Sequence, residues 1–252
     1  MPGRKSVLFV FTSASRVLNG DPTGWYLPEA AHPYYEVEPH HDIDFAATKG
    51  PNPPIDGNSV VQLHYDEYQL RFLEDPVVQK KLRECKYLKD CKASDYDAIF
   101  YVGGRGPAID LATDLDNIKL CNEVRSFSLL APSHRFADKI RAMVAQFWQS
   151  GKIVSAVCHG PCALVNVQNA DGTSIYKGKK YTGFSNVEEE LIGGVTGLPF
   201  LLETKFQMAG GIYVKAEKPW LSNVVRDGKL ITGQNPASAQ AIGKALAAAL
   251  AE

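Results

Sequence analysis

A cysteine and a histidine stand side by side in the stretch KIVSAVCHGPCALVNV, residues 152–167. A thiolate is a strong nucleophile, and an adjacent imidazole can accept the thiol proton and move protons on a bound substrate. The pair Cys158–His159 follows a run of β-forming residues and precedes Gly160 and an apolar run of helical character. This order is typical of a nucleophile elbow, in which a sharp turn presents the side chain at the end of a strand.

The interpretation of Cys158 as a nucleophile has an alternative, because cysteine is among the most commonly buried residue types. A helix N-terminus beside the sulfur, with Arg105 near it, is expected to lower the pKa of the thiol below its ordinary value of about 8.5. Cys162, four residues on, is expected to pack inside the following helix.

The positions of the histidines limit which residue could act as the base for Cys158. Amidotransferases with a cysteine at such an elbow use a histidine near the C-terminus, whereas none of the six histidines here follows His159. A lone histidine is otherwise more often a core residue with satisfied hydrogen bonds. Its adjacency to Cys158 makes His159 the expected partner.

The elements that would position this pair alternate between short apolar strands and amphipathic helices. Buried strands are predicted at 6–14, 42–48, 97–104, 152–158, 179–185 and 228–234. Helices are predicted at 77–91 after an Asp75–Pro76 cap, at 137–152, and at 237–251 after Asn235–Pro236. This pattern predicts an α/β fold with a mostly parallel sheet covered by helices on both faces.

The whole chain, 1–252, is expected to form one domain. Residues 116–134 read as an insertion, which we interpret as a surface excursion, with a lid or a dimer contact as the alternative. Ligands of such sheets bind beyond the carboxyl ends of the strands. The segments YVGGRGP (101–107) and AVCHGP (156–161) both end strands, so we expect them at the same edge.

Composition excludes several classes of protein. The chain has 252 residues, 45% hydrophobic and 22% charged, and a net charge of −1, which gives no electrostatic case for nucleic acid or an anionic membrane. No apolar run approaches the roughly 20 residues of a membrane helix. Five cysteines, an odd number without zinc-type CxxC spacing, favour a reduced setting. We therefore expect a cytoplasmic protein, with the nucleus as the alternative.

No cofactor or metal is expected. Side chains of adjacent residues on an extended chain point to opposite sides, so His40 and His41 make a poor pair of metal ligands. The sequence also has no nucleotide-binding loop. The aromatic segment 32–35 and Trp220 are assigned to the core, with a pocket wall as the alternative.

Four motifs carry a resemblance to a known family: AVCHGP (156–161), TGFSNVEEELIGG (182–194), DGKLITGQNPASA (227–239) and TGWYLPEAAHPY (23–34). Together they resemble the ThiJ/PfpI superfamily, and within it the glutathione-independent glyoxalase (glyoxalase III) and heat-inducible chaperone branch. The resemblance covers most of the chain. It implies a flavodoxin-like three-layer sandwich that forms a homodimer and needs no cofactor.

The resemblance also implies roles for individual residues. Cys158 matches the family nucleophile and His159 the adjacent base. Aligning Thr182-Gly183-Phe184 with the motif places the acid that orients the histidine at Glu189, with Glu188 and Glu190 as one-residue alternatives. Three consecutive glutamates would otherwise more often form a solvated helix start.

A second acid and a loop complete the expected site. Glu29 matches the buried acid that bonds the cysteine sulfur, and it should be protonated because two adjacent negative charges are costly. The amides of Gly104 and Arg105 are expected to bind an oxyanion. Family members carry GGHG where this chain has GGRG, so Arg105 replaces a titratable ring and puts the usual activity in doubt.

The resemblance implies conversion of methylglyoxal, a small 2-oxoaldehyde, to D-lactate through a Cys158 hemithioacetal, with His159 as the proton shuttle. Two alternatives stay open. The chain is a stress-response holdase chaperone or protein deglycase with a vestigial site, binding unfolded clients, or it is a hydrolase or hydratase that uses the same thiol.

Overall fold

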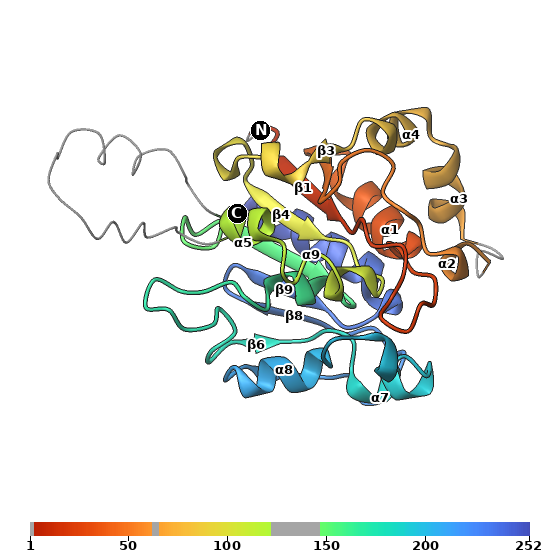
Figure 1. Ribbon diagram of the computed structural model, residues 1–252. Coiled ribbons are helices and arrows are strands. Elements are labelled where there is room, and N and C mark those ends of the chain that lie inside the picture. The colour runs from red at the N-terminus through yellow and green to blue at the C-terminus, as the bar shows by residue number, and fades with distance from the viewer. Residues whose placement is uncertain (1–2, 62–65, 122–146) are drawn as a thin grey trace, which may run out of the picture.

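A computed structural model describes residues 3–61, 66–121 and 147–252 of the chain. Its centre is a seven-stranded sheet in the order β3-β2-β1-β4-β5-β9-β8 (Figure 1). All neighbouring pairs are parallel except β8 and β9, which are antiparallel at one edge. The strands are β1 (Ser6–Phe11), β2 (Asp42–Ala47), β3 (Lys86–Tyr87), β4 (Ala98–Tyr101), β5 (Ile153–Val157), β8 (Val224–Asp227) and β9 (Leu230–Gly233).

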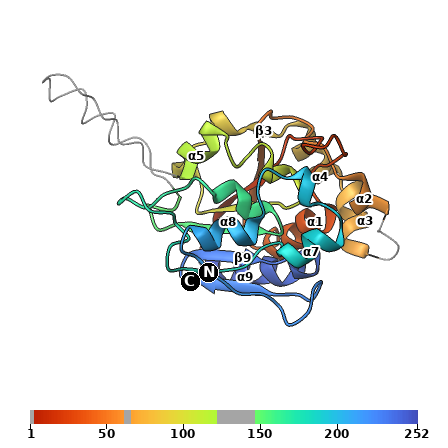
Figure 2. The same cartoon turned by 60° about the horizontal axis from the view of Figure 1, so that its bottom comes forward.

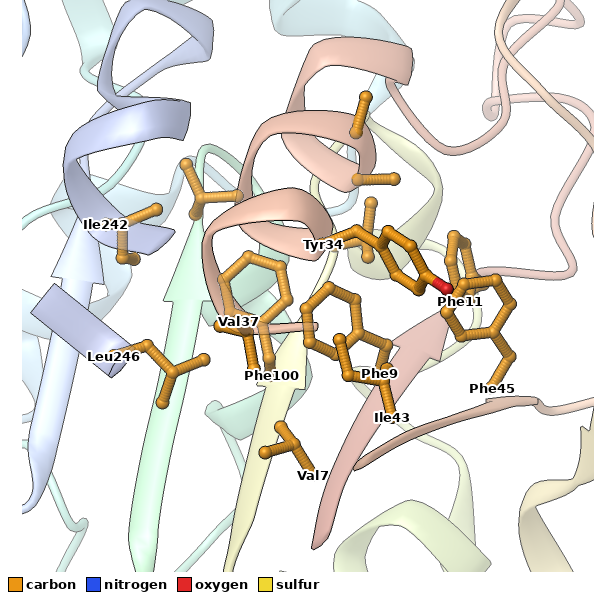
Figure 3. Close-up of a cluster of buried hydrophobic side chains, with 14 of the residues drawn as sticks. Val7, Phe9, Phe11, Tyr34, Val37, Ile43, Phe45, Phe100, Ile242 and Leu246 are labelled. Atoms are coloured by element: carbon orange, nitrogen blue, oxygen red, sulfur yellow. The ribbon is translucent and has the colours of Figure 1, made fainter. Parts of the chain in front are cut away.

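The central strands are buried on both faces, which explains why their sequences are continuous apolar runs. Alternate residues of β1 enter different cores. Phe9 and Phe11 pack on one face with α1 (Leu27–Val37) and α9 (Ala239–Ala251), and Figure 3 shows Phe9 beside Phe100 and below Tyr34. Leu8 packs on the other face. The mostly parallel α/β fold predicted from the sequence is confirmed.

Helices cover both faces of the sheet. Helices α1 and α9 lie side by side on one face (Figure 2), and α5 (Leu115–Cys121) and α8 (Leu202–Met208) contribute to the core of the other. In the part of the chain that the structure describes, the remaining α-helices are α2 (Gly57–Val61), α3 (Glu67–Glu74), α4 (Pro76–Arg83) and α7 (Asn186–Leu191).

The helix predicted at 77–91 is too long. Its start is confirmed, since the Asp75 carboxylate accepts from the amides of Val77 and Val78. Helix α4 nevertheless ends at Arg83, because the chain then pairs as β3 with the edge of the sheet at β2. Tertiary pairing overrides the local helical pattern here.

The strand predicted at 179–185 is also shorter and lies outside the main sheet. Only Lys180–Tyr181 forms a strand, β6, and it pairs with β7 (Ile212–Tyr213). The next amide, that of Thr182, donates to the Thr232 hydroxyl at 2.9 Å, so a side chain takes the place of a strand partner. The predicted cap at Asn235 is found at a 3₁₀ turn that leads into α9.

Several predictions fall partly outside the described residues. Most of the predicted helix at 137–152 does, as does the insertion beyond Cys121. Of the proposed insertion, residues 116–121 belong to α5. Among the described residues, no helix combines the length and apolarity needed to cross a membrane.

Of the two adjacent histidines, His41 is held by the N-terminal segment. The Nδ1 atom of His41 accepts from the Lys5 amide at 3.4 Å, and its carbonyl accepts from Arg4. In residues 3–61, 66–121 and 147–252, no group of three or more histidine, cysteine or acidic side chains is placed to hold a metal ion.

Candidate active site

Cys158 occupies a strained turn at the end of β5. Its φ is +59°, in the left-handed region that costs a non-glycine residue on the order of 1–3 kcal/mol. The strand hydrogen bonding continues up to this residue, whose amide donates to the Gly233 carbonyl at 2.9 Å. A short 3₁₀ helix, Gly160–Leu164, follows. The turn therefore has the geometry of a nucleophile elbow.

The end of β4 meets this turn at very close range. A side-chain carbon at position 160 would lie 2.5 Å from the Tyr101 carbonyl, and one at position 103 would lie 2.7 Å from Cβ of Cys158. Only glycine fits at these two places. The strand ends that carry Gly104 and Cys158 thus lie together at one edge of the sheet.

His159 lies between the thiol and a carboxylate. Its Nδ1 atom is 3.3 Å from Sγ of Cys158, and its Nε2 atom is 2.6 Å from Oε2 of Glu189. Because a carboxylate accepts hydrogen bonds, we assign the proton of the neutral ring to Nε2. Nδ1 then offers its lone pair to the thiol. The thiol, the imidazole and the carboxylate therefore lie in line, an arrangement that suits a nucleophile, a base and an orienting acid.

Helix α7 separates the roles of three consecutive glutamates. Ser185 caps the helix, and Glu188 returns to the cap, accepting from the Ser185 amide and hydroxyl. Glu189 is rotated by about 100° along the helix and points to His159. Glu190 is exposed. Of the three alternatives left open by the sequence, Glu189 is the one that contacts the ring.

Glu29 lies in the first turn of α1 and is fully buried. Neither oxygen makes a hydrogen bond of normal geometry, although the Cys158 thiol and the Gly104 amide are close enough to act on its charge. Burial raises the pKa of Glu29 to about 8, against the lowering effect of these two groups. The carboxyl is therefore mostly protonated at neutral pH.

The expected lowering of the Cys158 pKa is wrong. Burial, followed by the Glu29 carboxyl, raises the pKa of the thiol well above its ordinary value, and the amides of Gly104 and His159 only oppose this. The sulfur-bearing residue is 4% exposed, and the helix after it is a 3₁₀ turn rather than an α-helix. The raised pKa favours the neutral thiol at neutral pH, and Nδ1 of His159 is the base in contact with it.

The GGRG loop contributes its backbone more directly than its cation. Gly104 has a φ of +98°, and its amide acts on the Cys158 sulfur. The Arg105 guanidinium donates to the Pro22 carbonyl at 3.3 Å in an exposed position. Of these two predicted oxyanion residues, the structure brings the Gly104 amide to the sulfur.

Sequence reasoning missed an aromatic wall behind the imidazole. The Phe184 ring stacks on His159 with centroids 4.4 Å apart, and the Trp220 ring makes a T-shaped contact with Phe184, with centroids 5.7 Å apart. Assignment of Trp220 to the core is wrong, because the residue is 43% exposed. The core assignment of the segment 32–35 holds for Tyr34 and Tyr35. The TGFS motif was the available signal for Phe184.

Comparison with known proteins shows what this chain is similar to. The model of the DJ-1/PfpI family matches residues 130–249. Glyoxalase 3 of Candida albicans is 29% identical over 244 residues, which cover 92% of this chain and 93% of that protein.

Two solved structures resemble the whole chain. Rapid Encystment Protein 24 kDa of Francisella tularensis has a TM-score of 0.80 and 34% identity, covering 98% of this chain and 99% of that one. Glyoxalase III from Candida albicans has a TM-score of 0.76 and 26% identity, covering 97% of each chain. The similarity therefore includes every segment that supplies the site.

Proposed function

The chain belongs to the DJ-1/PfpI family, and from its site we propose that it is a glutathione-independent glyoxalase that converts methylglyoxal to D-lactate. The proposal depends on two contacts of the His159 ring, one from Nδ1 to Sγ of Cys158 and one from Nε2 to the Glu189 carboxylate. A buried thiol in contact with a base suits addition to an aldehyde. Relatives named as glyoxalases that match over nearly their whole length support the same substrate class.

The first step forms a covalent adduct. Nδ1 of His159 accepts the thiol proton as the Cys158 sulfur bonds to the aldehyde carbon of methylglyoxal. The imidazolium then gives this proton to the aldehyde oxygen, which leaves a hemithioacetal hydroxyl and a neutral His159 ring. Glu189, 2.6 Å from Nε2, stabilises the imidazolium that forms. The Gly104 amide and the neutral Glu29 carboxyl can donate to charge that develops on sulfur or oxygen.

The following steps are an internal redox exchange. His159 moves the proton of the former aldehyde carbon to the neighbouring ketone oxygen, which gives an enediol. It then takes the proton from the hydroxyl on the first carbon and delivers a proton to the second carbon. The first carbon is oxidised to a thioester and the second is reduced to an alcohol. Water then cleaves the thioester, releasing lactate and restoring the thiol. Electrons move only within the substrate, so the reaction consumes water and no external oxidant.

The proposal includes a homodimer as the working form and leaves Arg105 outside the proton transfers. Its guanidinium is at the surface and contacts Pro22, so it is placed to attract acidic substrates rather than to replace a titratable ring at the sulfur. The alternative hydrolase or hydratase activity would use the same thiol and base on another small substrate.

A second candidate function has its own observation. Apolar side chains are exposed around α7, namely Val187, Leu191, Ile192, Val195, Trp220 and Leu221. Such a patch suits a holdase chaperone that binds unfolded clients. Suppression of the aggregation of a heat-denatured protein by the Cys158→Ser variant would favour this function, because it would not need the thiol.

The decisive experiment is incubation of the purified chain with methylglyoxal in the absence of glutathione, with chiral detection of lactate. We expect D-lactate from the wild type. Cys158→Ser should lower turnover by at least 10²-fold, because a serine hydroxyl stays protonated at neutral pH. Cys91→Ser, at a partly exposed thiol remote from the turn, is the control and should keep wild-type activity. Equal rates for both variants would refute the mechanism.

A further inference from the structure

Glu188, the neighbour of the orienting acid, is the most highly hydrogen-bonded carboxylate at the site. It is completely buried. Besides the two groups of Ser185, it accepts from the Trp220 amide at 2.9 Å, from Nδ2 of Asn235 at 2.8 Å and from Nε2 of Gln234 at 3.1 Å. These donors belong to the α7 cap, to the loop before β8 and to the end of β9. One side chain therefore ties three separate segments together.

The charge of Glu188 is stabilised where it lies. Burial alone would raise its pKa, but hydrogen bonds from Asn235, Trp220 and Ser185 hold the pKa below its usual value. All of its partners are donors, so an anionic acceptor is the group that fits. A glutamine at this position would direct its own NH₂ donors at these groups.

The contacts of Glu188 lead to the catalytic imidazole by two routes. Along α7, fixing Glu188 against the end of β9 fixes the rotation of the helix that aims Glu189 at Nε2. Through its cap, Ser185 is the neighbour of Phe184, whose amide donates to the Cys158 carbonyl at 2.9 Å and whose ring covers His159. The first route fixes the position of the Glu189 carboxylate. The second fixes the Phe184 ring that covers one face of the His159 imidazole.

The loop before β8, which contains Trp220, also has a strained backbone. Trp220 has a φ of +67°, which a bulky residue adopts only when its surroundings impose it. The Trp220 amide is one of the groups that donate to Glu188, and the Trp220 ring makes a T-shaped contact with Phe184. Asn235 also donates to the carbonyl of the next residue, Leu221, at 3.0 Å. The loop is thus clamped to the same centre.

We propose that Glu188 is a positioning residue of the active site, which acts through Glu189 and Phe184 to hold His159 in the orientation that accepts the Cys158 proton. The inference rests on the proposed roles of Cys158, His159 and Glu189. It gives the Gln234-Asn235 pair of the GQNP motif a purpose at the site, in addition to the cap that Asn235 provides for the turn before α9. Glu188 itself touches no reacting atom.

The test measures the pH dependence of Cys158 alkylation by iodoacetamide in the full chain, with mass spectrometry to separate Cys158 from the other thiols. Loosening Glu189 removes support from the imidazolium, so proton transfer from the thiol requires a higher pH. For Glu188→Gln we expect the midpoint to move up by about one pH unit and the rate at pH 7 to fall about tenfold. Glu29 and Tyr26 also act on the charge of Cys158, and they are unchanged in every variant.

Two further variants keep the test decisive. Asn235→Ala removes one donor to Glu188 and should shift the profile in the same direction by less, which decides the matter if Glu188→Gln does not fold. Glu190→Gln, an exposed neighbour on the same helix, should leave the profile unchanged. Wild-type midpoints in Glu188→Gln and Asn235→Ala, with lower melting temperatures only, would overturn the inference.

The outcome is separable from that of the proposed function, because alkylation needs no turnover. If the wild type leaves methylglyoxal unchanged, the glyoxalase proposal fails and the alkylation profile still decides the role of Glu188. If the wild type is active, Glu188→Gln should lower kcat with little change in KM, since the residue positions the base rather than the substrate.

Discussion

At the scale of single residues, Glu29 and Cys158 share a buried space in which two negative charges would repel each other strongly. The raised pKa of Glu29 resolves this by keeping the carboxyl protonated near neutral pH. A neutral carboxyl can donate a hydrogen bond to a thiolate, whereas a carboxylate would oppose its formation. The acid therefore assists the nucleophile only below the pH at which it loses its own proton.

This pairing predicts how stability changes with pH. The folded pKa of about 8 lies above the usual 4.5, so the folded state holds a proton that the unfolded state releases first. The contribution of Glu29 is complete below pH 4.5 and is lost as pH rises through 8. Between these limits the wild type should lose stability relative to Glu29→Gln, at up to roughly 1.4 kcal/mol per pH unit.

Urea unfolding of both proteins at pH 5, 6.5 and 8 measures this difference. Glutamine imitates the protonated acid, so the two proteins should be similar in stability at pH 5 and diverge at pH 8, with the variant more stable. Parallel curves would mean that Glu29 ionises normally inside the fold.

At the scale of elements, the turn after β5 depends on the close approach of β4. A methyl group at position 160 would lie 2.5 Å from the Tyr101 carbonyl, a backbone atom that cannot rotate away. We expect Gly160→Ala to cost about 1–3 kcal/mol of unfolding free energy and to lower activity, because the turn must move away from β4. Thermal unfolding and methylglyoxal turnover measure the two effects.

Gly57→Ala provides the matched control. Nothing lies within 4 Å of the added methyl group at that position, so its stability should stay within about 0.5 kcal/mol of the wild type. A Gly160→Ala protein as stable as Gly57→Ala would show that the strand ends tolerate separation.

The elements also show what sequence can predict. The strands at β1, β4, β5 and β9 follow from apolar runs that only a doubly covered sheet can bury. The predicted helix at 77–91 was longer than α4 because the pairing of Lys86 with β2 is a long-range contact, which a local sequence pattern does not contain. The alignment could place Glu189 only to within one residue, since the choice among three glutamates depends on how Glu188 is bonded. The direction of the Cys158 pKa depends on burial, which spacing does not reveal.

At the scale of the whole molecule, the five cysteines differ in their surroundings. Burial raises the pKa of Cys85 and Cys121 to about 12, and Cys162 is likewise buried with a raised pKa. Cys91 is partly exposed, with a pKa of about 11. Cys158 is buried too, but among the described thiols it is the one in contact with an imidazole base.

We expect mild peroxide to oxidise Cys158 first, to the sulfenic or sulfinic state, with parallel loss of activity. In the proposed mechanism, proton transfer to His159 supplies a thiolate at Cys158, and the other four thiols have no such base in contact among the described residues. Mass spectrometry of peptides during a peroxide time course gives the order of modification. Earlier oxidation of Cys91 would indicate that access to solvent outweighs contact with the base.

The exposed ring of Trp220 gives the molecule an optical reporter of its own. Trp25 is 2% exposed and sealed in the core, whereas Trp220 is 43% exposed and abuts the ring that covers His159. Acrylamide should therefore quench a red-shifted part of the intrinsic fluorescence that a Trp220→Phe protein lacks. That difference spectrum would follow occupancy of the sulfur and displacement of the loop before β8 in real time, without any attached dye.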